Sequence, residues 1–143
     1  MTQPVDNAIT KIAAVVAGVS GIRQAPTYPT ETQSVDPFAV TYVYNGTVNA
    51  GVMGAKKMLL AIAVDLYVPR LDIARDMATL TPFLDLMTNA LIGEVSGSGG
   101  LFSGSITTFE RLDIEFLPNM TYGAVTMIGY RFLMQNVKLL LAL

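Results

Sequence analysis

The stretch LLAIAVDLYVPRLDIARDMATLTPFLDLMTNAL, residues 59–91, changes its apolar period from two residues to 3.6 residues at the pair Pro69-Arg70. Before this pair, alternate residues form one unbroken apolar strand face, made of Met58, Leu60, Ile62, Val64, Leu66 and Val68. After it, apolar residues recur at helical spacing at Ile73, Met77, Leu80, Leu84, Met87 and Leu91. The stretch therefore predicts a long strand, a tight turn and a long amphipathic helix that begins near Asp72. It indicates architecture and offers no residue placed for chemistry.

In the rest of the chain, the spacing of apolar residues indicates further helices and strands, and prolines and glycines mark the loops between them. We expect a helix over 5–19, a proline-rich extended loop over 23–37, a strand over 38–44, and a last hairpin whose strands cover 106–116 and 124–138. Residues 45–55 predict either a loop of about ten residues or a protruding hairpin with strands of its own, because ordinary hairpin loops are shorter. Within the long helix, Thr81-Pro82 predicts a kink or a short stop and restart. Glu110 interrupts the apolar alternation of its strand, which indicates a bulge or an edge.

These elements predict the order α-β-β-α-β-β in a single domain over residues 1–143. The fold class that follows is α+β: an antiparallel or mixed sheet of about four strands with two main helices packed on one face.

Composition indicates that the chain assembles with other subunits. Hydrophobic residues make up 52% of the 143 residues and charged residues only 14%, whereas an average soluble domain is about 25% charged. A domain of this size cannot bury so much apolar surface internally. Surplus apolar surface usually marks a protein interface, so we expect an oligomer or a component of an assembly.

The residue types that are missing exclude several kinds of chemistry. The chain contains neither cysteine nor histidine, which removes disulfides, thiolate metal sites, Ser-His-Asp catalysis and the commonest general base. A net charge of −2 gives no overall electrostatic footprint for nucleic acid. No apolar run reaches the roughly 18 residues that a membrane span needs. Together with the absence of an export signal, these features predict synthesis in the cytoplasm and no membrane partner.

Several carboxylates could in principle carry chemistry. Asp65, Asp72 and Asp76 could together hold Mg²⁺ in a small metal-dependent hydrolase. We favour a solvated helix face for the last two, so that their joint replacement by asparagine would matter little. Asp113 and Glu115 share a strand face with Arg111, which indicates an exposed polar side rather than an acid–base pair. The glycine-rich residues 93–100 lack the lysine of a phosphate-binding loop. We therefore expect no catalytic residues, no bound metal and no cofactor.

A set of motifs in fixed order gives the chain a family resemblance. The motifs are Gly21-Ile22-Arg23, Ala25-Pro26-Thr27-Tyr28-Pro29, Pro37-Phe38, Asp65-Leu66-Tyr67-Val68-Pro69-Arg70, Leu80-Thr81-Pro82-Phe83-Leu84, Thr121-Tyr122-Gly123 and Ile128-Gly129-Tyr130. In this order and texture, over roughly residues 9–138, the chain resembles the tail terminator (tail completion) proteins of long-tailed bacteriophages.

The resemblance implies a non-enzymatic subunit of the phage neck. Such subunits form a ring, typically a hexamer, that caps the tail tube, ends its polymerisation and joins it to the head-side connector or stopper. It implies three partners: further copies of the chain, the tail tube protein and the connector. Genome DNA would pass through the lumen without specific binding. The expected location is the virion, after assembly in the host cytoplasm. Two alternatives stay open: another neck or tail component, such as a stopper, adaptor or tail-tube subunit, and the metal-dependent hydrolase described above.

Two apolar segments are the candidate interface residues. Val48, Val52 and Met53 place apolar side chains at the tip of the glycine-rich segment 45–55, where burial against a neighbour would stabilise an interface. The chain ends with Leu139, Leu140, Leu141 and Leu143. Chain ends are normally polar, so these leucines must be covered, either by their own sheet or, as we prefer, by a neighbouring subunit.

Overall fold

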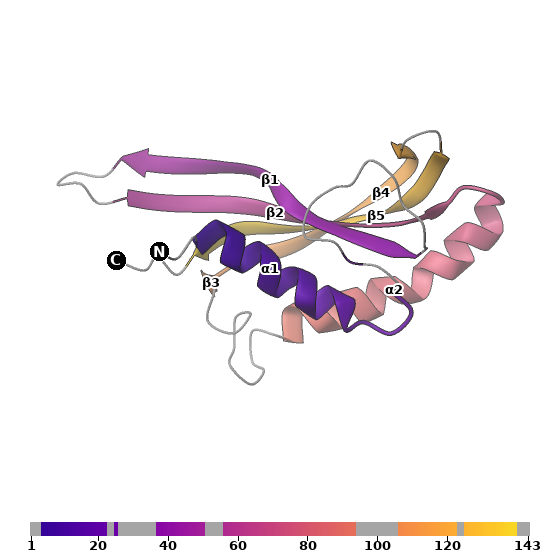
Figure 1. Cartoon of the computed structure of the whole chain (residues 1–143), viewed down its shortest axis with the longest axis horizontal. Coiled ribbons are helices and arrows are strands. Elements are labelled where there is room, and N and C mark those ends of the chain that lie inside the picture. The colour runs from indigo at the N-terminus through magenta and orange to yellow at the C-terminus, as the bar shows by residue number, and fades with distance from the viewer. Residues whose placement is uncertain are drawn as a thin grey trace.

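The protein is an α+β domain in which two helices lie on the same side of one antiparallel sheet (Figure 1). The computed structural model describes residues 4–22, 25, 37–50, 56–93, 106–122 and 125–139. The elements follow in the order α1 (Pro4–Ala17), β1 (Phe38–Ala50), β2 (Lys56–Pro69), α2 (Ile73–Gly93), β3 (Ile106–Thr108), β4 (Arg111–Tyr122) and β5 (Val125–Leu139). The predicted fold class and order are therefore confirmed, with β3 as a short addition to the four long strands.

The sheet places β2 and β5 at its centre. Its order is β1-β2-β5, and both β3 and β4 pair with the far edge of β5. Every pairing is antiparallel. The single strand predicted over 106–116 is interrupted at Phe109 and Glu110, which divides it into β3 and β4. The anomaly seen at Glu110 is thus a break between two strands that share one edge.

Alternation along β2 sorts its residues onto the two faces of the sheet, as predicted. The helix-facing core contains Leu60, Ile62, Val64, Leu66 and Val68 from β2, Ile9, Ile12 and Val16 from α1, and Leu80, Phe83, Met87 and Leu91 from α2. The opposite face carries a smaller cluster around Phe38, Val40, Tyr67, Leu117 and Met127. Both faces of β2 are buried through its middle, because Ala61, Ala63 and Asp65 are covered as well.

Residues 45–55 resolve in favour of the protruding hairpin. β1 continues to Ala50 and β2 begins at Lys56, so the expectation of a ten-residue loop is wrong. The outer part of this hairpin extends beyond the helices (Figure 1). An irregularity in the register between Val43 and Asn45 leaves Tyr44 as an extra residue in β1, and such bulges bend a strand away from its sheet.

Two expectations about prolines need correction. α2 continues through Pro82 as one helix, so it does not stop and restart there. The hydroxyl of Thr81 donates to the carbonyl of Met77 at 2.7 Å. Pro118 lies outside the two predicted strands, 106–116 and 124–138, yet the structure places it within β4 at an irregularity of the register. Proline is tolerated there because a residue on an edge strand can do without its N–H.

Candidate functional site

The most concentrated polar chemistry in the described structure surrounds Asp65, on the sheet face that the helices leave open. Asp65 lies in the middle of β2 with only 1% of its surface exposed. Strand register places Val40 of β1 beside it on one side and Arg131 of β5 on the other. A buried carboxylate is costly unless it is paired and hydrogen-bonded, so the partners of Asp65 decide what this site can do.

Four hydrogen bonds converge on this one carboxylate. Arg131 donates from Nε to Oδ1 at 2.9 Å and from Nη2 to Oδ2 at 3.3 Å. The hydroxyls of Tyr42 and Tyr67 both donate to Oδ2, at 2.6 and 2.7 Å. The contact between Arg131 and Asp65 is bidentate, which is the strongest geometry for an arginine–carboxylate pair. Both Asp65 oxygens are thereby engaged within the protein, with three of the four hydrogen bonds on Oδ2 and one on Oδ1.

An outer ring of contacts holds Arg131 in place. Its Nη1 lies 3.6 Å from the carboxylate of Glu115 on β4, and its guanidinium carbon lies 5.0 Å from the ring centroid of Tyr44 on β1. Its side chain is only 13% exposed. We call Tyr42, Asp65, Tyr67 and Arg131 the polar lock, because with Glu115 they tie together the four long strands.

Two members of the polar lock, Tyr42 and Arg131, have raised pKa values. Burial, followed by the hydrogen bond to Asp65 and by its negative charge, raises the pKa of Tyr42 far above its usual range. The hydrogen bond to Asp65 also raises the pKa of Arg131. A general acid or base works best with a pKa near the working pH. Tyr42 and Arg131 therefore hold their protons more tightly than usual, far from such a pKa.

Gly129 on β5 makes room for the ring of Tyr67. The two residues are register partners on neighbouring strands. A Cβ atom at Gly129 would collide with the backbone oxygen of Leu66 and would lie 2.9 Å from Cδ1 of Tyr67. Glycine is thus required where Tyr67 leans over β5.

Asp72 and Asp76 do not join Asp65; they hold the start of α2. Asp76 Oδ2 accepts hydrogen bonds from the backbone N–H groups of Leu71 and Asp72, at 2.8 and 3.0 Å. In return, Asp72 Oδ1 accepts the N–H of Arg75 at 3.3 Å. This reciprocal arrangement caps the helix. Asp76 is only 5% exposed, so the expectation that both carboxylates lie on a solvated face is wrong for Asp76.

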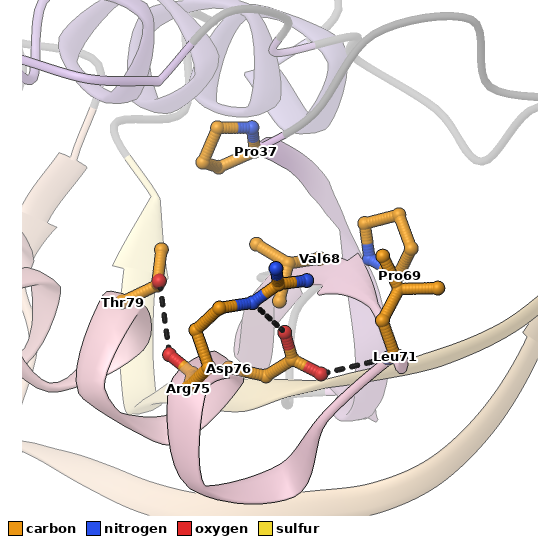
Figure 2. Close-up of a pocket in the computed structure, with 7 residues that line it drawn as sticks. All are labelled: Pro37, Val68, Pro69, Leu71, Arg75, Asp76 and Thr79. Atoms are coloured by element: carbon orange, nitrogen blue, oxygen red, sulfur yellow. Dashed lines mark hydrogen bonds and ion pairs between the residues drawn. The ribbon is translucent and has the colours of Figure 1, made fainter.

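A pocket of about 230 Å³ lies beside this cap, between the end of β2 and the first turns of α2 (Figure 2). Its lining is formed by Pro37, Val68, Pro69, Leu71, Arg75, Asp76 and Thr79. Arg75 Nε is 4.0 Å from Asp76 Oδ1, and the other Asp76 oxygen is turned toward the backbone at Leu71. The pocket therefore has apolar walls from four residues and polar groups from Arg75, Asp76 and Thr79.

Two further carboxylates, Asp113 and Glu115, belong to the edge strand β4. Arg111 Nε lies 3.3 and 3.2 Å from the two Asp113 oxygens, and Gln135 donates to Asp113 Oδ2 at 3.2 Å. Glu115 is 62% exposed at its side chain and faces Arg131. Within the described ranges, no three residues among His, Cys, Asp and Glu lie close enough together to hold a metal ion. The trio Asp65, Asp72 and Asp76 thus has no common site.

The candidate interface residues fall at the limits of the described chain. Val48 pairs with Met58 in the outer hairpin, and Leu139 pairs with Ile106 at the end of β5. Val52, Met53, Leu140, Leu141 and Leu143 lie outside the described residues, as does the glycine-rich segment after Gly93. Their assignment as an interface stays a prediction.

Sequence patterns held a signal for the polar lock that reasoning from motifs missed. Asp65 is the only charged residue between Met58 and Pro69, and Arg131 is the only one between Val125 and Val137. Charges are almost never fully buried unless paired, so a lone charge in each of two apolar strands indicates that each needs a buried partner, without saying which.

Comparison with known proteins adds no identification. No known family model matches the chain, and no curated protein is significantly similar to it. In the described part of the chain, no helix combines the length and the hydropathy needed to cross a membrane.

Proposed function

We propose that this protein is a non-enzymatic structural subunit of a phage neck. It acts as a tail terminator: copies of the chain form a ring, a hexamer in the assembled particle, that caps the finished tail tube and ends its polymerisation. The ring also joins the tube to the head-side connector, and genome DNA passes through its lumen without specific binding. The proposal places the protein in the virion after assembly in the host cytoplasm.

The observation that carries the proposal is the order of the family-like motifs along the chain, now set within an α-β-β-α-β-β domain. The motif from Asp65 to Arg70 supplies the centre of the polar lock and the turn into α2. The motif around Gly129 supplies the glycine that admits Tyr67. These motifs serve the architecture, which is what a structural subunit requires of them.

The surface chemistry supports assembly as the task of the fold. The polar side chains that could suggest an enzyme are engaged with one another or with backbone. By contrast, large apolar side chains stand exposed on both outer strands and along α2. Exposed apolar surface on a small domain marks an interaction site.

The test is to add the purified protein to tail tube protein while the tube polymerises. A terminator should remain a monomer or a single ring by native mass spectrometry and negative-stain imaging, and it should stop tube growth. A protein that stays strictly monomeric at high concentration and is also monomeric on the virion would contradict the proposal.

Two alternatives make different predictions in the same experiment. A tail-tube subunit would elongate into fibres by itself, whereas a stopper or adaptor would bind the connector without ending tube growth. The metal-dependent hydrolase has lost its geometric basis, because Asp65, Asp72 and Asp76 have separate structural partners. Calorimetry with magnesium would revive it only if binding were abolished by Asp65→Asn in a folded protein.

A further inference from the structure

Exposed apolar side chains gather on the two outer strands of the sheet. Among the described residues, four of the eight large hydrophobic residues that are exposed lie there: Val43 and Tyr44 on β1, at 38% and 46%, and Ile114 and Phe116 on β4, at 48% and 39%. The other four lie on α2 or just before it. Both outer strands therefore carry exposed apolar side chains.

Within the part of the chain that the structure describes, each of these two strands has a strand partner on one side only. Among the described strands, β1 pairs only with β2 and β4 pairs only with β5. Free edges are normally blunted by charged side chains, yet β1 carries no charged residue from Phe38 to Ala50. Its outer segment, Val43–Thr47, is exposed throughout. An uncharged, exposed edge of this kind is a template for another strand.

β4 has different chemistry on its two faces. Register places Arg111, Asp113 and Glu115 on the side of Arg131, away from the helices. Ile114 and Phe116 point to the helix side, where Phe116 stacks at 5.3 Å on Tyr130. They are nevertheless exposed. A partner for β4 must therefore be apolar on its helix side and polar or aromatic on the other.

The outer segment of β1 meets both requirements. Val43 is the register partner of Ile62 and so points to the helix side, while Tyr44 lies over Arg131 on the opposite side. A copy of β1 placed beside β4 would set Val43 next to Ile114 or Phe116. It would also set the Tyr44 hydroxyl near the charges of Arg111 and Glu115.

Strand direction fits the same arrangement. β1, β2, β5 and β4 alternate in direction across the sheet, so β4 runs opposite to β1. The β1 strand of a second copy, with its helices on the same face, would therefore continue the antiparallel alternation beside β4.

We propose that copies of this chain join edge to edge, with the outer segment of β1 of one copy paired antiparallel to β4 of the next. Five paired residues span about 17 Å of strand. Because two different edges meet, the contact is heterologous, and repetition must close a ring or run on as a filament. The closure into a ring rests on the proposed function; the pairing of the two edges does not.

The absence of cysteine from the chain makes a sharp test possible. Each of the variants Val43→Cys, Ile114→Cys and Ile92→Cys carries a single thiol at an exposed position. Ile92 lies on α2, outside both edges, and serves as the matched control. Pairs of full-length variants are mixed at high concentration and treated with a short bis-maleimide, and covalent dimers are separated by denaturing electrophoresis.

Val43→Cys mixed with Ile114→Cys should give a covalent dimer that is lost when either variant is treated alone or when Ile92→Cys replaces Ile114→Cys. A dimer from Ile114→Cys alone would indicate symmetric pairing of two β4 strands and would overturn the proposal. So would a dimer from Val43→Cys alone, or a mixture that gives no more dimer than the control.

A second pair of variants tests the contact without cross-linking. Phe116→Lys should abolish oligomers in native mass spectrometry, whereas Ile92→Lys should retain them, with equal circular dichroism spectra for both. Equal oligomer formation by the two variants would overturn the proposal. If the protein caps tail tubes but fails the cross-linking test, only the proposed contact is refuted. If it cross-links as expected but does not cap tubes, only the terminator function is refuted.

Discussion

The two faces of β2 are buried to a similar degree but are stabilised by different interactions. The helix-facing side, from Leu60 to Val68, packs against apolar residues of both helices. The opposite side is centred on Asp65, whose charge is compensated by Arg131 and two tyrosines. The apolar face tolerates substitutions that keep its volume, whereas each member removed from the polar lock leaves a buried polar group without one of its hydrogen bonds. One face of the sheet thus tolerates volume-conserving substitutions, whereas the other depends on particular polar partners.

The largest effect should come from breaking the polar lock at its centre. Asp65→Ala leaves Arg131 with only the exposed Glu115 as counter-charge and removes the carboxylate that accepts from Tyr42 and Tyr67. We expect it to lower the free energy of unfolding by about 3–5 kcal/mol, measured by urea denaturation. A variant with Asp65→Leu, Arg131→Met, Tyr42→Phe and Tyr67→Phe together should lose much less. If it loses as much as Asp65→Ala, packing rather than charge explains the effect.

A truncation on the helix-facing side provides the comparison. Leu80 is fully buried in α2, and Leu80→Ala should cost about 2–5 kcal/mol through lost burial and the cavity left behind. Leu80→Met keeps most of the volume and should cost less than about 1.5 kcal/mol. Equal decreases in the free energy of unfolding for the two variants would contradict the idea that this face tolerates substitutions that keep its volume.

Removal of one hydroxyl should weaken the polar lock without dismantling it. Tyr42→Phe deletes one hydrogen bond to a charged acceptor and should cost about 1.5–3 kcal/mol. The pH dependence sharpens this prediction. Because the pKa of Tyr42 is raised in the folded protein, its contribution is fully present below pH about 10, where the unfolded tyrosine begins to ionise, and is lost as the pH rises through the folded pKa.

Stability measured from pH 9 to 11 should therefore fall less steeply for Tyr42→Phe than for the unsubstituted chain. Tyr44→Phe is the matched control, because it changes another tyrosine of β1 that donates no hydrogen bond to Asp65. Parallel pH profiles for the unsubstituted chain and Tyr42→Phe would show that Tyr42 titrates normally.

The smallest effect should come from the cap of α2, which lies outside both faces. Asp76→Ala removes the acceptor for two backbone N–H groups and should cost about 1–2 kcal/mol. Asp72→Ala removes one longer, exposed hydrogen bond and should cost about 0.5–1 kcal/mol. Thermal unfolding of both variants gives the comparison. A larger loss for Asp72→Ala would contradict the cap as described.

The sequence alone was enough to predict the order of the elements, the strand face from Leu60 to Val68 and the helix that follows it. These features depend on periods that repeat every two or 3.6 residues, so neighbouring positions carry the whole signal. The same local logic misjudged the length of β1, because the glycines at 46 and 51 resemble a turn whether or not the strands continue to pair.

Only the tertiary structure decided which groups compensate the charge of Asp65, and why Asp76 is buried. Arg131 is 66 positions from Asp65 in the chain, and nothing between them encodes the register that sets the two side by side. Register is a property of the whole sheet, fixed once the apolar faces of β2 and β5 turn to the same helices. Periodicity can place a charged residue on a face, but its partner is known only when the neighbouring strand is in place.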